Sequence, residues 1–203
     1  MDVLSGIFSA FGLSASAGLN AYIPLLVVAL LARYTTWIRL APPWDHLSNG
    51  WVIAALVVLL LIEILADKIP VVNHLNDIIQ TFVRPTAGAI LFAASAQSLS
   101  SVHPVLAILC GLLVAGSVHA VKAVAIRPAV TATTGGAANL AVSTGEDLLA
   151  TVLSVVAALL PVLLGTLICL AVAWIILKIW QRAKRPAGGA RKGRLPQSWQ
   201  PQD

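Results

Sequence analysis

Long apolar stretches fill most of the chain, and they predict helices that cross a membrane. A helix needs about 20 apolar residues to span the hydrocarbon core of a bilayer. The run from 146 to 180 is too long for one span, and Pro161 divides it into two helices. The pattern predicts an all-α, polytopic transmembrane helical bundle. Its six predicted membrane segments are residues 4–32, 51–69, 85–100, 104–126, 146–160 and 161–180.

The first of these segments contains features that interrupt a helix. Residues 14–24 read Ser-Ala-Ser-Ala-Gly-Leu-Asn-Ala-Tyr-Ile-Pro. Small residues allow close contact between helices. Pro24 removes a backbone donor and its ring clashes with the preceding turn. We therefore predict a break in the first membrane helix between Gly18 and Pro24.

Two stretches between the segments have a mixed pattern. Residues 71–83 are amphipathic and predict a helix that lies at the membrane interface or folds back into a cavity. Residues 127–145 are rich in Thr, Ala and Gly and predict irregular backbone, which at membrane depth must border protein or water. Asn20 and Asn139 stand at the two predicted breaks, where an amide can either bind a ligand or cap a half-helix.

A weak internal repeat accompanies these breaks. The Arg-Pro pair at residues 84–85 recurs at 127–128, and residues 14–20 loosely resemble residues 131–139. Repeated units with broken helices are common in transporters. The pattern is typical of a duplicated architecture, although the matching elements are short.

The composition narrows the class of protein further. Of 203 residues, 59% are hydrophobic and only 10% are charged, against about 25% charged in an ordinary soluble domain. The mean hydropathy is +0.91. A soluble protein of this size needs more polar surface than this chain can supply. The composition excludes a disordered chain and argues strongly against a soluble enzyme.

The positive charge is concentrated at the C-terminus, where six of the 13 Lys and Arg residues follow the last apolar segment. Basic residues next to a membrane helix mark its cytoplasmic side. We expect residues 1–182 to form the transmembrane domain and residues 183–203 a basic, disordered cytoplasmic tail that attracts anionic lipid. The tail lacks interleaved aromatic residues, so we expect no nucleic acid partner. The six basic residues are Arg182, Lys184, Arg185, Arg191, Lys192 and Arg194.

The candidate chemistry lies in ionisable residues near membrane depth, which are costly there and normally face a cavity or a partner. Glu63 and Asp67 are four residues apart on one helix face, and His119 and Lys122 are three apart on another. Two carboxylates close together in a low dielectric require a proton or a cation. We expect the second and fourth segments to meet through these groups, with Glu146 joining from the fifth.

Such an arrangement has two interpretations. One is a polar vestibule, open to the cytoplasm, that binds an ion, a proton or an anionic head group. The other is a set of structural ion pairs at helix ends, with some cations extending to lipid head groups. The candidate substrate- or ion-binding residues are Asn20, Glu63, Asp67, Lys68, Asp77, Arg84, His119, Lys122, Arg127, Asn139 and Glu146.

The spacing indicates no catalytic constellation. The four His residues are isolated, and Cys110 and Cys169 lie inside apolar runs. The Gly-Thr stretch before Glu146 lacks the Lys-Ser/Thr ending of a P-loop. We therefore expect no catalytic residues, no metal and no cofactor, and a protein that is not an enzyme is favoured.

Three motifs carry a resemblance to a known family. They are the Gly-Leu-Ser-Ala-Ser-Ala-Gly-Leu-Asn-Ala-Tyr-Ile-Pro stretch at residues 12–24, Glu-Ile-Leu-Ala-Asp-Lys-Ile-Pro at 63–70 and Ala-Thr-Thr-Gly-Gly at 132–136. With these motifs the chain resembles the bacterial membrane family known as domain of unknown function 4126, over about residues 5–180. The resemblance implies a multi-pass prokaryotic membrane protein and no established activity.

Three functions remain open. The leading one is a small transporter or carrier in the bacterial inner membrane, with a small molecule or an ion as substrate. The second is a membrane-embedded enzyme or flippase that acts on a lipid phosphate, with Arg84, Lys122 and Arg127 holding the phosphate. The third is a non-catalytic scaffold. The sequence is compatible with an oligomer but does not require one.

Overall fold

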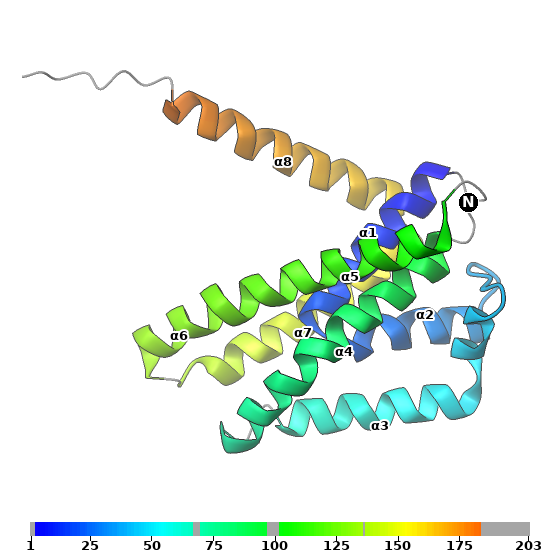
Figure 1. Cartoon of the computed structure of the whole chain (residues 1–203), viewed down its shortest axis with the longest axis horizontal. Helices are drawn as coiled ribbons and strands as arrows, with labels where there is room; N and C mark the ends of the chain where they lie inside the picture. Colours follow the sequence, from blue (N-terminus) through cyan, green and yellow to red (C-terminus); the bar gives the residue numbers. More distant parts are fainter. Residues whose placement is uncertain (1–2, 67–69, 97–101, 136, 184–203) are drawn as a thin grey trace, which may run out of the picture. The chain divides into compact units, whose positions relative to one another are not determined.

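The computed structural model describes residues 3–66, 70–96, 102–135 and 137–183. These residues form α-helices joined by short connections, without a strand in the described ranges, which confirms the all-α fold class. A 3₁₀ helix, η1, covers Trp44–Ser48, and a π-helix, η2, covers Lys122–Ile126. The α-helices are α1 (Val3–Leu19), α2 (Tyr22–Tyr34), α3 (Gly50–Ala66), α4 (Pro70–Ala96), α5 (Pro104–Val121), α6 (Arg127–Thr134), α7 (Asn139–Leu159) and α8 (Pro161–Ala183), and Figure 1 shows them in chain order.

Each of the six predicted segments has a helical counterpart, and the predicted division at Pro161 is confirmed. Three helices, α1, α2 and α3, are apolar but shorter than a bilayer crossing normally requires. Four helices in the described ranges are long and apolar enough to cross a membrane: Ile78–Ala96, Pro104–Thr134, Asn139–Leu159 and Pro161–Gln181.

The described surface is unusually apolar. Phe82 is 73% exposed, and Leu113 and Leu148 are 67% and 66% exposed. Large exposed apolar patches on a monomer indicate contact with something other than water. Together with the helix lengths, this surface gives the chain the build of a multi-pass membrane protein.

The chain divides into two compact units after Thr166. The second unit contains the part of α8 that begins at Leu167. Its large side chains are exposed, and Lys178 Nζ lies 4.9 Å from the ring centre of Trp174. This pairing fits an interfacial position, because Trp and Lys are enriched where a membrane helix meets the head groups.

The predicted break in the first membrane helix is confirmed. Helix α1 ends at Leu19 and α2 begins at Tyr22. The Asn20 Oδ1 accepts hydrogen bonds from the backbone N–H groups of Tyr22, at 3.0 Å, and Ile23, at 3.1 Å. Pro24 then falls in the first turn of α2, where a missing N–H costs no intrahelical bond.

Helix α4 differs from the prediction. We expected a separate amphipathic helix before a membrane segment that begins at Pro85, but α4 continues through Pro85 from Pro70 to Ala96. A proline within a membrane helix removes only one backbone bond, and neighbouring groups can compensate. The polar pattern reflects the orientation of α4: Gln80 and Arg84 are buried, whereas Phe82 faces outward.

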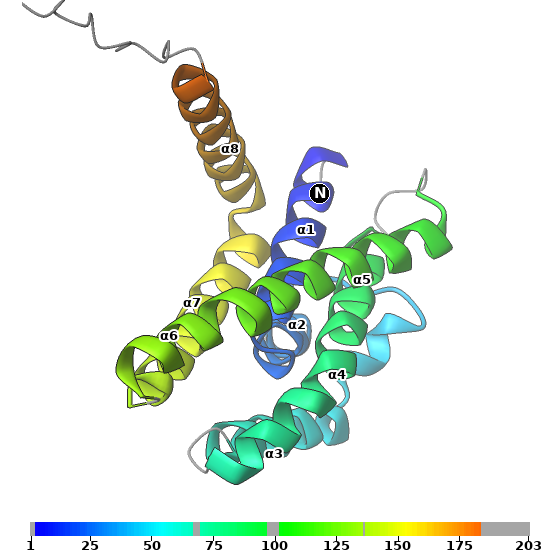
Figure 2. The same ribbon diagram turned by 60° about the vertical axis from the view of Figure 1, so that its left-hand side comes forward.

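The Thr/Ala/Gly stretch also differs from the prediction. Instead of irregular backbone over 127–145, the structure continues α5 through η2 and α6 to Thr134. Gly135 then adopts a left-handed conformation with φ of 61°, which ends the helix. Figure 2 shows α7 turning back from the end of α6. Thr133 and Thr134 donate to the carbonyls of α6, so their hydroxyl groups do not interrupt it.

Helix α1 is the central element of the first unit and packs against α4, α5 and α7. Small residues bring these helices close together. A Cβ atom added to Gly18 would lie 2.6 Å from the Ala115 carbonyl oxygen of α5. Serine hydroxyls join the same interfaces, since Ser14 donates to the Gly88 carbonyl at 2.8 Å and Ser16 to the Ala150 carbonyl at 2.8 Å.

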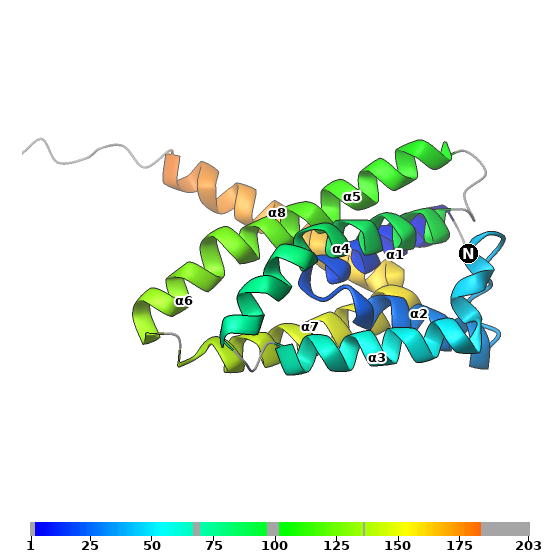
Figure 3. The same ribbon diagram turned by 60° about the horizontal axis from the view of Figure 1, so that its bottom comes forward.

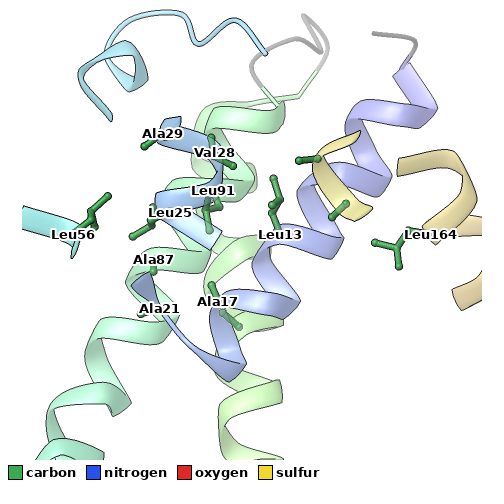
Figure 4. Close-up of a cluster of buried hydrophobic side chains, with 13 residues drawn as sticks. Leu13, Ala17, Ala21, Leu25, Val28, Ala29, Leu56, Ala87, Leu91 and Leu164 are labelled. Atoms are coloured by element: carbon green, nitrogen blue, oxygen red, sulfur yellow. The ribbon is translucent and has the colours of Figure 1, made fainter. Parts of the chain in front are cut away.

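Apolar side chains fill the space between α1, α2 and α4. Figure 4 shows Leu13 and Ala17 of α1, Leu25 of α2 and Leu91 of α4 in this cluster. Helix α3 packs against α2 on the outside, as Figure 3 shows, and contributes Leu56. This layer lies between the second half of α1 and α2, which runs back beside it after the break.

The glycine contacts give a first prediction. A Cβ atom added to Gly111 would collide with the Gly88 carbonyl oxygen and would lie 2.6 Å from the Phe92 Cβ. We expect Gly111→Ala to lower the unfolding free energy by about 1–3 kcal/mol. Gly116 lies on the same helix, but its nearest neighbour is Pro85 Cγ at 3.8 Å.

Gly116→Ala is the matched control. It should be neutral or stabilising by up to about 1 kcal/mol, because alanine is the better helix former. Denaturant unfolding of both purified variants in detergent measures the difference. Equal stability of the two variants would contradict the close approach of α4 and α5.

Candidate functional site

A buried ion pair joins α3 to α4. Helix α3 is apolar along most of its length but carries Glu63 near its described end. The Arg84 Nη2 donates to Glu63 Oε1 at 2.9 Å, and the two side chains are each 2% exposed. In such surroundings each charge depends on the other, because an isolated buried ion is strongly destabilising.

His119 connects this pair to α5. The Arg84 Nη1 lies 3.4 Å from His119 Nδ1, and the other ring nitrogen lies 3.3 Å from the Thr81 hydroxyl. Thr81 and Arg84 are three residues apart on the inner face of α4. The imidazole therefore bridges two side chains of α4, and its tautomer decides which nitrogen donates.

A second ion pair lies at the break in the first membrane helix. Lys122 Nζ is 2.6 Å from Glu146 Oε2 of α7 and donates to the Leu19 carbonyl at 3.1 Å. Leu19 is the last residue of α1, where the carbonyls lack intrahelical partners and the helix dipole is negative. The buried Lys122 ammonium group therefore neutralises the charge of the Glu146 carboxylate and satisfies a carbonyl at the negative end of α1.

The adjacent acid of α7 contacts the other side of the break. Asn20 Nδ2 donates to Asp147 Oδ1 at 2.9 Å, while its oxygen accepts from the first turn of α2. Consecutive residues of α7 thus hold the two half-helices: Glu146 through Lys122, and Asp147 through Asn20. The break is fixed from both ends by side chains of α7.

Tyr22 lies between these two groups. Its side chain lies close to Gln80 and within electrostatic reach of Glu63 and Arg84. Arg84 in turn lies within electrostatic reach of Lys122. All these residues form one network, which we call the polar cluster: Asn20, Tyr22, Glu63, Gln80, Thr81, Arg84, His119, Lys122, Glu146 and Asp147.

Six of the predicted site residues belong to the polar cluster: Asn20, Glu63, Arg84, His119, Lys122 and Glu146. We expected the second and fourth predicted segments, which are α3 and α5, to meet through these groups. They are joined by Arg84 of α4, which contacts Glu63 of α3 and His119 of α5.

The other predicted residues have different positions. Arg127 is half-buried at the start of α6 and lies within electrostatic reach of Lys122. Asn139 is half-buried at the start of α7, where it donates to the Thr131 hydroxyl at 3.2 Å, away from the break at Asn20. Asp67 and Lys68 lie outside the described residues, as does the side chain of Asp77.

Several members of the polar cluster were not among the predicted site residues: Tyr22, Gln80, Thr81 and Asp147. Gln80 and Thr81 precede Arg84 by four and three residues, the spacing of one helix face. This spacing was a usable signal. Nothing in the sequence indicates that Asp147, and not Asn139, is the partner of Asn20.

The polar cluster retains hydrogen-bonding capacity. Gln80 Oε1 and Arg84 Nε are buried and have no hydrogen-bond partner in the described part of the chain. An acceptor and a donor of this kind are usually satisfied by ordered water or a ligand. Within the same residues, His, Cys, Asp and Glu nowhere gather in threes with a geometry that could hold a metal ion.

The sequence model of the family described as "Domain of unknown function (DUF4126)" matches residues 7–182. The chain belongs to this family. The matched range contains every described helix of the DUF4126 chain except the ends of α1 and α8. Comparisons with curated proteins and with solved structures gave no match. The DUF4126 match names no activity.

The Glu63–Arg84 pair gives a second prediction. Arg84→Met alone should lower the unfolding free energy by about 3–5 kcal/mol, because it leaves the Glu63 carboxylate buried without its cation. Glu63→Leu/Arg84→Met together should recover most of this loss, since apolar residues can replace a buried ion pair at little cost.

A double-mutant cycle in detergent measures the coupling between the two side chains. Arg33→Gln, a change at an exposed arginine, is the control and should stay within about 0.5 kcal/mol of the wild type. If the two substitutions at residues 63 and 84 are simply additive, the pair has no energetic role in the fold.

Proposed function

We propose that the chain is a small membrane carrier for an ion or a small molecule, and that the polar cluster is its coupling site. The observation that supports this most directly is a buried ion pair, Lys122–Glu146, at a break in a membrane helix, with the Glu63–Arg84 pair within electrostatic reach. Leu19 and Asn20 at the break are held by Lys122, Glu146 and Asp147. Broken helices with ion sites at their ends are a recurring design of secondary transporters.

The cost of this arrangement supports a role beyond packing. A break exposes backbone groups in a low-dielectric region, and each buried charge adds a desolvation penalty. An uninterrupted apolar helix would avoid both costs. Costly intramembrane charges are retained mainly where ions, protons or substrates pass.

Proton coupling follows from the chemistry of the Lys122–Glu146 pair. A proton on Glu146 neutralises the carboxylate and leaves the Lys122 ammonium without its counter-charge. The ammonium can then hold an anion next to the Leu19 carbonyl. Release of the proton restores the 2.6 Å pair and displaces the anion. In this scheme, a proton and an anion move together.

Residues 1–182 form the membrane-embedded carrier in this proposal, and the C-terminus faces the cytoplasm of a prokaryotic cell. Lys178 and the basic residues from Arg182 onward support this orientation, since cytoplasmic flanks are enriched in Lys and Arg. The basic tail, residues 183–203, would bind anionic lipid. A reporter fused after Asp203 that is active only outside the cytoplasm should be inactive.

Transport by reconstituted protein is the test. Liposomes containing pyranine report internal acidification when acetate, butyrate, phosphate or potassium is added outside at a fixed pH gradient. We expect acidification with at least one of the three anions, above the rate of protein-free liposomes and above the rate with potassium alone. Glu146→Gln should lower this rate at least 10-fold, because it removes the proton site.

Asn139→Ala is the matched control, since Asn139 lies outside the polar cluster. It should transport as the wild type does. Wild-type rates in Glu146→Gln would exclude the coupling scheme. Absence of flux with every solute, accompanied by hydrolysis or flipping of a polyprenyl phosphate, would instead favour the lipid-phosphate function.

A further inference from the structure

A cavity lies beside the first part of α1, from Gly6 to Leu13, away from the polar cluster. Its volume is about 230 Å³, and it is bounded by α1, Val28 of α2, the segment after α2 and the end of α4. Leu13 is the lining residue of α1 closest to the break, seven residues before Asn20. At 1.5 Å per residue, this places the cavity floor about 10 Å along the helix from the break.

The lining combines one cation, hydroxyl groups and apolar surface. Arg39 is the cationic residue among those that line the cavity, and Ser9 of α1 and Ser95 of α4 are lining residues with hydroxyl groups. Leu13 and Val28 form an apolar floor. No acidic residue lines the cavity in the described part of the chain. These groups suit a molecule with an anionic head and a short apolar part.

The wall after α2 is made of irregular backbone. Residues 36–40 line the cavity and have no helical hydrogen-bonding pattern. Thr36, Trp37 and Arg39 are exposed, so this wall is open to the surroundings. The segment also offers backbone groups to a ligand.

An apolar layer separates the cavity from the polar cluster. Leu13, Ala17 and Ala21 follow one another along the first membrane segment, and Leu25 and Leu91 pack against them, as Figure 4 shows. All five side chains are at most 7% exposed. An anion in the cavity is therefore kept apart from Lys122 until this layer moves.

We propose that this cavity binds a small organic anion, a carboxylate or phosphate monoester with a short alkyl chain, as an entrance of the carrier. This inference rests on the proposed carrier function and gives its substrate class. The volume of about 230 Å³ limits the size of the ligand, since it corresponds to roughly eight water molecules at about 30 Å³ each. A four-carbon chain with one anionic group fits this limit.

Thermal unfolding of the full-length protein in detergent tests the site, because a ligand that binds the folded state raises its apparent stability. Butyrate and butyl phosphate should stabilise the wild type at constant ionic strength, and butylammonium should not. Arg39→Gln should weaken this stabilisation at least 10-fold in apparent Kd. Ser9→Leu, which fills the cavity, should abolish it.

Arg33→Gln is the matched control. It removes the same charge close by in the sequence, but Arg33 donates to the Ser48 carbonyl and does not line the cavity. Butyrate should stabilise it as it does the wild type. Equal losses in Arg33→Gln and Arg39→Gln would overturn the proposal, since only general electrostatic attraction would then remain.

A further arm distinguishes a soluble anion from a lipid head group. Short-chain phosphatidic acid should compete no better than butyl phosphate, and stabilisation by the lipid alone would overturn the proposal. The binding measurement in detergent does not depend on whether the protein transports anything. Arg39-dependent binding without proton flux would therefore retain this site and remove the carrier function, whereas loss of the Arg39 dependence would remove the site whatever the flux.

Discussion

The buried contact of Lys122 with Glu146 and with the Leu19 carbonyl is the interaction on which the first unit depends. A helix that stops inside an apolar environment leaves carbonyl groups that no water satisfies. Lys122 satisfies one of them, and Glu146 balances the charge that this requires. At the start of α2, Asn20 accepts a hydrogen bond from the backbone N–H of Ile23, and its amide nitrogen donates to Asp147. The break is thus a stable feature because α5–η2 and α7 reach it together.

Close packing makes this reach possible. A lysine bridges helices only if their backbones are near, and small residues line the contacts of α1. Gly18 meets Ala115 of α5, and Ser16 shares a 2.7 Å hydrogen bond with Ser154 of α7. The small-residue interfaces and the charged groups therefore depend on each other: close approach lets Lys122 reach α1, and the satisfied charges hold the approach.

The sequence predicts the helical class, the break at Asn20 and six residues of the polar cluster, because hydropathy and helical spacing are local properties. It does not predict the partners. Asn20 and Asn139 look equivalent as amides at breaks, yet only Asn20 lies in the cluster, because α6 stays helical up to Gly135. Pro85 looks like a boundary, yet α4 continues through it, because the burial of Arg84 is a tertiary property.

The π-helical turn at Lys122–Ile126 changes the phase of the helix that contains it. The Arg127 N–H donates to the Lys122 carbonyl, five residues back, so this turn holds one residue more than an α-turn. One residue is about 100° of rotation. If side-chain directions are predicted from α-helical spacing starting at His119, Lys122 is correctly placed on the same face as His119. Every side chain beyond residue 126 is then misplaced by about a quarter turn. A single deletion within residues 123–126 would restore the α-helical phase and turn α6 by the same angle, without touching any charged residue.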